Sequence, residues 1–207
     1  RLRYVRQLGL AHLVYPGATH SRFEHALGAY HLAQETVRLL REAGGEGFRD
    51  LDGRIVVAAA LLHDIGHYPF SHALEELGVP HHETVAGPLI AEGAVAEILR
   101  SEFSADAPER VLALVRAESR EPLAGLISGY FDNRAVYARI SGSIDLDKID
   151  YLKRDAMNCG VSYGEVDVDR LRHALVLVAD PATGRHSVGL RERGLSALES
   201  LLFAKYQ

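Results

Sequence analysis

The stretch IVVAAALLHDI, residues 55–65, joins a continuous apolar run to two ionisable side chains, His63 and Asp64. A run with so little polar face predicts a helix that is buried on all sides and that opens near Asp52 or Gly53. Burying an imidazole and a carboxylate at its end costs several kcal/mol unless each is paired or bound to a cation. The sequence therefore predicts a metal site at the end of a buried helix.

Helical signals continue on both sides of this stretch. Ser21 and Glu24 have the spacing of a capping box, and apolar residues recur after them at helical intervals, which predicts a long helix over 21–43. Glycines at 44, 45 and 47 end it. We expect a short helix after Pro69 and further helices near 82–100, 107–118, 122–130, 144–157 and 192–206, the second of these capped by Asp106.

A short β-hairpin is the exception to the helical pattern. Apolar residues alternate over 174–178 and 186–190, on either side of the turn sequence DPATG. No repeat and no interdomain linker separates the helices. We therefore expect one all-α domain over residues 1–207, with a hairpin within 174–190.

Composition narrows the functional class. Of the 207 residues 47% are apolar, and the formal net charge is -5, so nucleic acid is an unfavourable main partner. One cysteine excludes an internal disulfide, and we identify neither a signal peptide nor an apolar run long enough to cross a membrane. We expect a soluble, cytoplasmic protein with no membrane partner.

Histidines are concentrated in one window: five of the eleven lie between His63 and His82. The best further metal donors are His25 and Asp147. Arg22 precedes His25 by three residues and shares its helix face, and a metal next to an arginine is typical of a phosphate site. Imidazole and carboxylate ligands without a thiolate suit a catalytic divalent ion rather than a structural zinc.

The predicted helix over 144–157 carries a polar stripe. Asp147, Tyr151 and Asp155 recur at intervals of four, with Lys148 and Arg154 beside them. We interpret Asp145 and Asp150 as solvated or helix-terminal charges. We assign structural roles outside the site to five further histidines: His12, His20, His31, His173 and His186.

Several motifs, in this order, carry a resemblance to a known family. They are RFEH at 22–25, HDIGH at 63–67, PFSH at 69–72, HE at 82–83 and DLDKIDY at 145–151. Together they resemble the HD-domain metal phosphohydrolases. They are most similar to the deoxynucleoside triphosphate triphosphohydrolases, the group that includes the SAM and HD domain-containing protein. The resemblance extends from Arg1 to about Gly160, and the chain can be a fragment of a longer protein.

The resemblance implies roles for thirteen residues. One divalent ion, whose identity among Mn, Fe, Ni, Mg and Zn stays open, would be bound by His25, His63, Asp64 and Asp147. Catalysis would involve His67, His72 and His82, with Glu75 in place of the family's aspartate; His82 is preferred to His81 by motif position. Substrate would contact Arg22, Lys148 and Tyr151 at the phosphates, Gln7 near the sugar, and Asp155.

The activity that the resemblance implies is hydrolysis of a deoxynucleoside triphosphate to a deoxynucleoside and inorganic triphosphate, by a homo-oligomer. Two alternatives stay open at this point. One keeps the metal site but acts on a nucleoside monophosphate or a signalling nucleotide. The other is a regulatory nucleotide-binding module without turnover.

Overall fold

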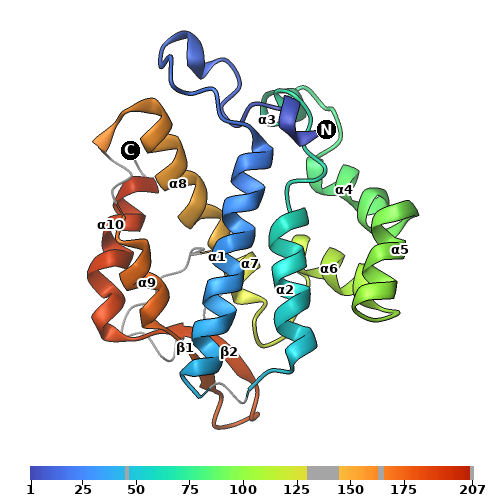
Figure 1. The fold of residues 1–207 in the computed structure, drawn as a ribbon, viewed down its shortest axis with the longest axis vertical. Coiled ribbons are helices and arrows are strands. Elements are labelled where there is room, and N and C mark those ends of the chain that lie inside the picture. Colours follow the sequence, from blue (N-terminus) through green and yellow to red (C-terminus); the bar gives the residue numbers. More distant parts are fainter. Residues whose placement is uncertain (45–46, 130–144, 163–165, 206–207) are drawn as a thin grey trace.

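Two long helices, α1 (Arg22–Glu42) and α2 (Asp50–Leu62), lie side by side through the middle of the molecule (Figure 1). The structure is a computed structural model that describes residues 1–44, 47–129, 145–162 and 166–205. The Ser21 hydroxyl accepts a hydrogen bond from the backbone N–H of Glu24, whose carboxylate accepts one from the backbone N–H of Ser21. The predicted capping box is confirmed, and it fixes where α1 begins.

The buried helix predicted around residues 55–65 is confirmed. Ile55, Val56 and Ala59 are fully buried. The bounds differ from the prediction because α2 already begins at Asp50 and ends at Leu62. His63 and Asp64 therefore lie at the helix cap and in the turn after it, where the side chains can leave the apolar environment of the helix.

Shorter helices flank this central pair. In Figure 1, α4, α5 and α6 lie on one side of it and α8, α9 and α10 on the other. The bounds are α3 Ser71–Glu75, α4 His82–Ala91, α5 Gly93–Glu102, α6 Ala107–Val115, α7 Gly125–Ser128, α8 Leu146–Cys159, α9 Val168–Ala174 and α10 Leu195–Lys205. The described residues also form the short 3₁₀ helices η1 Leu2–Tyr4, η2 Ala11–Leu13 and η4 Glu192–Gly194.

The helix predictions need correction at three points. The single helix expected near 82–100 is two helices, because Glu92 is extended and Gly93 has a φ of +63°, which breaks the helix. The helix α9 was not predicted. Asp106 does precede α6, but its carboxylate accepts from the Ser104 hydroxyl rather than from a helix N–H. Residues 130, 144 and 206 of the predicted helices lie outside the described residues.

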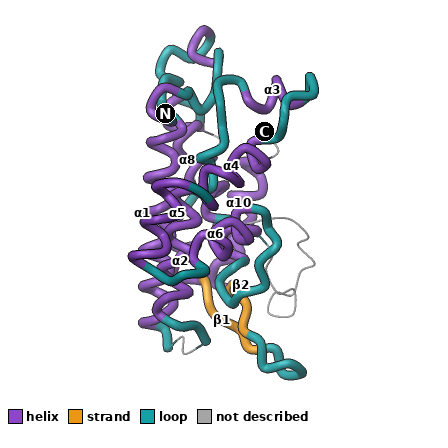
Figure 2. Tube along the Cα trace, turned by 90° about the vertical axis from the view of Figure 1, so that its right-hand side faces the viewer, coloured by secondary structure: helices purple, strands orange, loops and turns teal. Residues whose placement is uncertain are grey.

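The predicted hairpin is confirmed, with β1 (Leu175–Ala179) pairing antiparallel to β2 (His186–Leu190). Leu175 lies opposite Leu190, and Ala179 lies opposite His186. Figure 2 shows the hairpin at the end of the molecule opposite to α3. The helical fold with one small hairpin is thus as expected. No helix among the described residues has the length and apolar character needed to cross a membrane.

Small residues along α1 determine what the fold brings together. Ala26, Ala29 and Ala33 are buried, and α1 packs against both α2 and α8. Short side chains let neighbouring helices approach closely. As a result, the beginning of α1, the end of α2 and the beginning of α8 converge, and each of them carries polar residues.

Candidate metal and phosphate site

A cavity of about 470 Å³ lies where these helix ends converge. Ten of the thirteen predicted site residues line it: Gln7, Arg22, His63, Asp64, His67, His72, His82, Asp147, Tyr151 and Asp155. The other three contact these lining residues or their neighbours. His25 is buried against His63 and Asp147, Glu75 contacts His72 and His82, and Lys148 is paired with Asp145.

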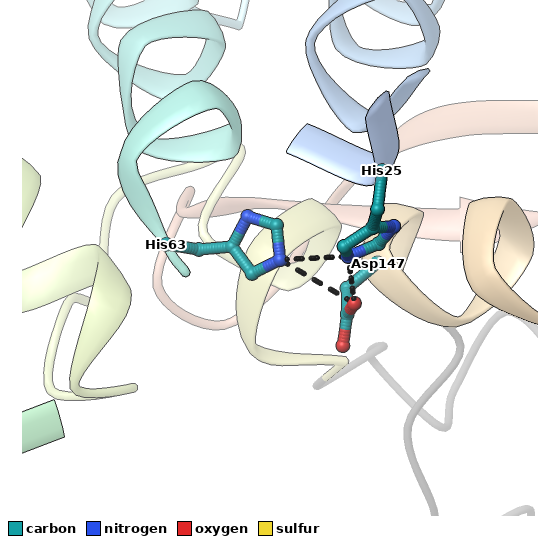
Figure 3. A group of neighbouring side chains, drawn as sticks. All are labelled: His25, His63 and Asp147. Atoms are coloured by element: carbon teal, nitrogen blue, oxygen red, sulfur yellow. Dashed lines mark hydrogen bonds and ion pairs between the residues drawn. The ribbon is translucent and has the colours of Figure 1, made fainter. Parts of the chain in front are cut away.

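Three side chains from three helix ends point toward one another (Figure 3). His25 comes from α1, His63 from the cap of α2 and Asp147 from the first turn of α8. The Nε2 atoms of the two histidines are 3.1 Å apart, and the Asp147 Oδ1 atom is 2.9 Å from the first and 3.4 Å from the second. These three atoms form a group of the size that can hold one metal ion.

Hydrogen bonds on the far sides of the rings determine the character of this group. The Nδ1 of His63 lies 2.8 Å from the carbonyl oxygen of Ala60, which can only accept, so Nδ1 carries the proton. The Nδ1 of His25 lies 2.8 Å from a carboxylate oxygen of Asp150 and donates in the same way. In the neutral imidazoles both Nε2 lone pairs therefore face each other and a carboxylate, an arrangement that a proton or a metal ion between them would relieve.

The electrostatics of the group favour positive charge. Burial lowers the pKa of His25, but hydrogen bonds with Asp147 and Asp150 outweigh it and raise that pKa to about 10. Burial also lowers the pKa of His63. The charges of Asp64 and Asp147 outweigh this effect, so that the pKa of His63 is raised above its usual value. The pKa of Asp147 is lowered, against its burial, by the two histidines. A group that retains protons this strongly also suits a divalent cation, so the residues present fit the expected metal.

Asp64 lies directly beside the three-residue group. Its Oδ1 is 3.4 Å from the Nε2 of His63, and its Oδ2 is 2.8 Å from the guanidinium of Arg22. Both Asp64 and Arg22 are buried. The predicted fourth ligand is thus within reach of the site, and the arginine predicted to bind phosphate is anchored by this carboxylate.

A second cluster of histidines occupies the neighbouring part of the cavity. The rings of His67 and His82 are stacked with centroids 3.7 Å apart, and the ring of His72 is 5.0 Å from that of His67. A Glu75 carboxylate oxygen accepts from both the backbone N–H and the Nδ1 of His82, at 2.9 Å each. Glu75 thus holds His82 in place through two hydrogen bonds. The Nδ1 of His81 lies 3.2 Å from the other carboxylate oxygen of Glu75, but the His81 side chain is 75% exposed.

The histidines of this second cluster differ in their surroundings. Burial lowers the pKa of His67 to about 4, so this imidazole is neutral at pH 7. Its Nδ1 is hydrogen-bonded to the Ser71 hydroxyl, a contact that sequence reasoning missed, and its Nε2 is 3.2 Å from Asp64. The side chain of His72 is 67% exposed, which leaves it accessible to a ligand in the cavity.

The polar stripe of α8 faces the cavity. Asp147, Tyr151 and Asp155 all line it. Burial and the neighbouring Asp147 raise the pKa of Tyr151 to about 12, so the phenol keeps its proton and can donate. Lys148 does not line the cavity; its Nζ atom is 2.5 Å from a carboxylate oxygen of Asp145.

Three polar residues have structural surroundings that sequence reasoning did not anticipate. The interpretation of Asp150 as a solvated or terminal charge is wrong, because it is buried and bonded to His25. Asp145 is helix-terminal as expected, capping α8 through the N–H of Lys148, but it too is buried. His20 is buried, with its Nε2 2.7 Å from the Asp155 Oδ1, and so contacts the site. The spacing of Asp150 from Asp147 and Arg154 is the one sequence signal that could have shown its role.

Comparison with known proteins agrees with the geometry. Residues 22–155 match the HD domain family. The chain is 34% identical over 208 residues to uncharacterized protein YwfO of Bacillus subtilis, covering all of this chain and 43% of that protein. It is 34% identical over 183 residues to the deoxynucleoside triphosphate triphosphohydrolase SAMHD1 of Gallus gallus, covering 78% of this chain and 30% of the relative.

A solved structure shares the fold as well. The crystal structure of a phosphohydrolase from Bacteroides thetaiotaomicron superposes with a TM-score of 0.73 at 31% identity, over all of this chain and 45% of that one. The chain therefore spans less than half the length of each of these three proteins.

Proposed function

The chain belongs to the HD-domain family of phosphohydrolases, and from that premise we propose that it hydrolyses deoxynucleoside triphosphates to a deoxynucleoside and inorganic triphosphate. The observation that carries this proposal is that three atoms able to hold a metal ion, an anchored arginine and a histidine cluster meet in or beside one cavity. Metal ligands and a fixed cation favour binding of a phosphoryl group, and imidazoles next to them supply proton transfer.

The proposed metal ligands are His25, His63, Asp64 and Asp147. A divalent ion bound there would polarise a phosphoryl oxygen and lower the pKa of a water molecule. The Arg22 guanidinium, of which Nη1 is committed to Asp64, keeps further N–H groups for phosphate oxygens, and the protonated phenol of Tyr151 is a second donor.

Proton transfer is assigned to the histidine cluster. His67 is neutral at pH 7 because burial lowers its pKa, so it is unsuited to act as the acid. His72 is exposed within the cavity and is our candidate for protonating the leaving 5′ oxygen, while Glu75 keeps His82 oriented. In the balanced reaction water adds to the α-phosphorus, the bond from phosphorus to the 5′ oxygen breaks, and that oxygen leaves with a proton.

The far part of the cavity supports a sugar-bearing substrate. Asp155 lies eight residues beyond Asp147 on α8, about 12 Å along the helix axis. It offers a carboxylate, and Gln7 offers a buried Oε1 atom that has no hydrogen-bond partner among the described residues. Acceptors of this kind suit hydroxyl donors, whereas the Arg22 end suits phosphate. This polarity favours a ligand with phosphate at one end and hydroxyl groups at the other.

One observation favours a shorter substrate as the second candidate. Lys148, expected to contact the phosphate chain, is instead paired with Asp145 outside the cavity lining. A site with one fewer free cation suits a nucleoside monophosphate or a signalling nucleotide better than a triphosphate. The two candidates differ in their products.

Product analysis in ¹⁸O-labelled water tests the proposal. Protein loaded in turn with Mn²⁺, Fe²⁺ or Mg²⁺ is incubated with a panel of ribo- and deoxynucleoside mono- and triphosphates, and the phosphate products are separated by ion chromatography. We expect triphosphate as the first product, carrying one ¹⁸O atom. Pyrophosphate or orthophosphate as the first product would overturn the proposal. The matched control is His72→Ala, which should release product at a far lower rate.

A further inference from the structure

The contact of His25 with Asp150 belongs to a larger arrangement that spans α1 and α8. Asp150 is buried, and both of its carboxylate oxygens accept hydrogen bonds from Arg154, at 2.8 Å each. One of these oxygens also accepts from the Nδ1 of His25. The carboxylate therefore cannot rotate without losing a bond to one of its two partners.

The room for this arrangement is provided by Gly28, one helical turn after His25. A Cβ atom at position 28 would lie 1.9 Å from a carboxylate oxygen of Asp150 and 2.2 Å from a terminal nitrogen of Arg154. Both distances are far below contact distance, so any side chain at position 28 displaces the pair. A glycine inside a helix normally costs about 1 kcal/mol relative to alanine, so its presence here calls for a reason such as this one.

The Nδ1 atoms of the two candidate metal-binding histidines have different hydrogen-bond partners. His63 donates its Nδ1 proton to a neutral backbone carbonyl, whereas His25 donates to a carboxylate that is itself held by a guanidinium. A hydrogen bond from the far nitrogen to a carboxylate fixes the tautomer and makes the near nitrogen a better metal ligand. His25 is also fully buried, so solvent cannot take over this role.

We propose that Asp150, clamped by Arg154 and seated over Gly28, is a positioning group that holds the Nε2 of His25 toward the metal and so sets the metal affinity of the site. This inference rests on the metal site of the proposed function, but not on its substrate. It explains why a glycine, an aspartate and an arginine from two helices meet behind a metal ligand. It also assigns a role to three residues that contact neither metal nor substrate.

The test is a metal-binding measurement on four variants. Mn²⁺ affinity is measured by competition with a chromophoric chelator for the unmodified protein and for Asp150→Ala, Arg154→Met, Gly28→Ala and the double variant Gly28→Ala with Asp150→Ala. We expect each single variant to raise the dissociation constant about 10- to 100-fold, the usual effect of losing a partner of a metal-ligating histidine. In the double variant Gly28→Ala should add nothing to Asp150→Ala, because the carboxylate it displaces is already gone.

Gly87→Ala is the matched control. It adds a methyl group inside α4, where the nearest atom is the tip of the Arg116 side chain at 2.8 Å, and it should leave the dissociation constant unchanged. Thermal melting of the metal-free variants and the visible spectrum of bound Co²⁺ separate loss of folding from a change at the metal.

In a protein that binds metal, two results would overturn the inference. The first is an unchanged dissociation constant in Asp150→Ala when the melting temperature alone falls, which would make the cluster purely structural. The second is that Gly28→Ala raises the dissociation constant by the same factor in the wild-type protein and in the Asp150→Ala variant. If the protein shows the expected affinities but releases orthophosphate, this inference stands and the proposed substrate is wrong. A protein that binds no metal at all would overturn both.

Discussion

Both ends of α2 carry buried ionisable side chains, but the charges at the two ends are balanced in different ways. At the N-terminal end Asp52 accepts from Arg49 at 2.8 Å and from Arg110 at 2.6 Å, and Arg110 also pairs with Glu121 at 2.7 Å. Two cations thus meet two carboxylates. At the C-terminal end, two imidazole Nε2 atoms and a carboxylate oxygen face each other, and the group has no donor unless it takes up a proton, as the raised pKa of His25 indicates for the empty group, or a metal ion.

This difference separates a structural network from a binding site. A closed set of ion pairs satisfies every charge and contributes to the stability of the fold. A set with an excess of acceptors is stabilised only when a proton or a metal cation joins it, and a metal then displaces the proton. Variants at the two ends should therefore affect different properties of the protein.

The largest contrast is between His63→Ala and Asp52→Ala. His63→Ala should reduce turnover to background, because a metal ligand is lost, and should leave the stability of the metal-free protein close to that of wild type. Asp52→Ala should keep turnover but lower the free energy of unfolding by about 2 kcal/mol, since a buried charged hydrogen-bond partner is removed. Steady-state kinetics and urea unfolding on both variants check this. Near-normal turnover of His63→Ala would contradict the contrast.

His72→Ala separates metal binding from proton transfer at the site beside the C-terminal end of α2. Loss of a positioned general acid typically costs about 10²- to 10⁴-fold in rate, and we expect a fall in this range with metal content intact. Single-turnover kinetics and metal analysis are the measurements. If the variant lost its metal, His72 would be a ligand, and if it kept its rate, the proton would have to come from elsewhere.

A smaller effect is expected from His20→Ala, which frees Asp155 from its 2.7 Å contact. Because Asp155 is proposed to contact substrate far from the reacting phosphate, KM should rise roughly 10-fold while kcat changes little. His31→Ala, which removes an exposed histidine on α1, is the control. A loss in kcat with unchanged KM would count against a role of this pair in substrate binding.

The smallest effect is the pH dependence of the closed network. The pKa of Asp52 is about 2 because, although burial raises it, hydrogen bonds from Arg49 and Arg110 lower it from 3.8. A depressed carboxyl pKa stabilises the fold fully above pH 3.8, and this contribution is lost as the pH falls through about 2. Urea midpoints of wild type and Asp52→Asn should therefore converge over this range. A constant gap between them down to pH 2 would argue against the network.

Features that depend on residues close together in the sequence could be predicted, whereas contacts between residues far apart in the sequence could not. The capping box at Ser21, the buried run at Ile55 and the hairpin turn after Asp180 depend on neighbours in sequence, and they were predicted. The helix α9 was missed, and the break at Gly93 was missed because apolar spacing continues across it. The contacts of His25 with Asp150 and of His20 with Asp155 join residues 125 and 135 positions apart. Only the packing of α1, and of the residues just before it, against α8 creates them.

Candidate ligands were easier to identify than the residues that hold them. His63 and Asp64 stand out because ionisable side chains follow an apolar run, and His25 and Asp147 because ordered motifs include them. Asp150 lies in the motif DLDKIDY as well, but the motif does not distinguish it from a solvated charge on a polar helix. Gly28 has no such signal, since a glycine on a long helix is ordinary.

Metal titration of the stripped protein tests the account most directly. Calorimetry at pH 7 with Mn²⁺, in buffers of different ionisation enthalpy, gives both the stoichiometry and the number of protons released. We predict one ion per chain with release of about one proton, because the pKa of His25 near 10 keeps the empty group protonated. Asp147→Asn should abolish most of this binding. Absence of binding by the wild-type chain, or equal binding by the variant, would contradict the proposed metal centre.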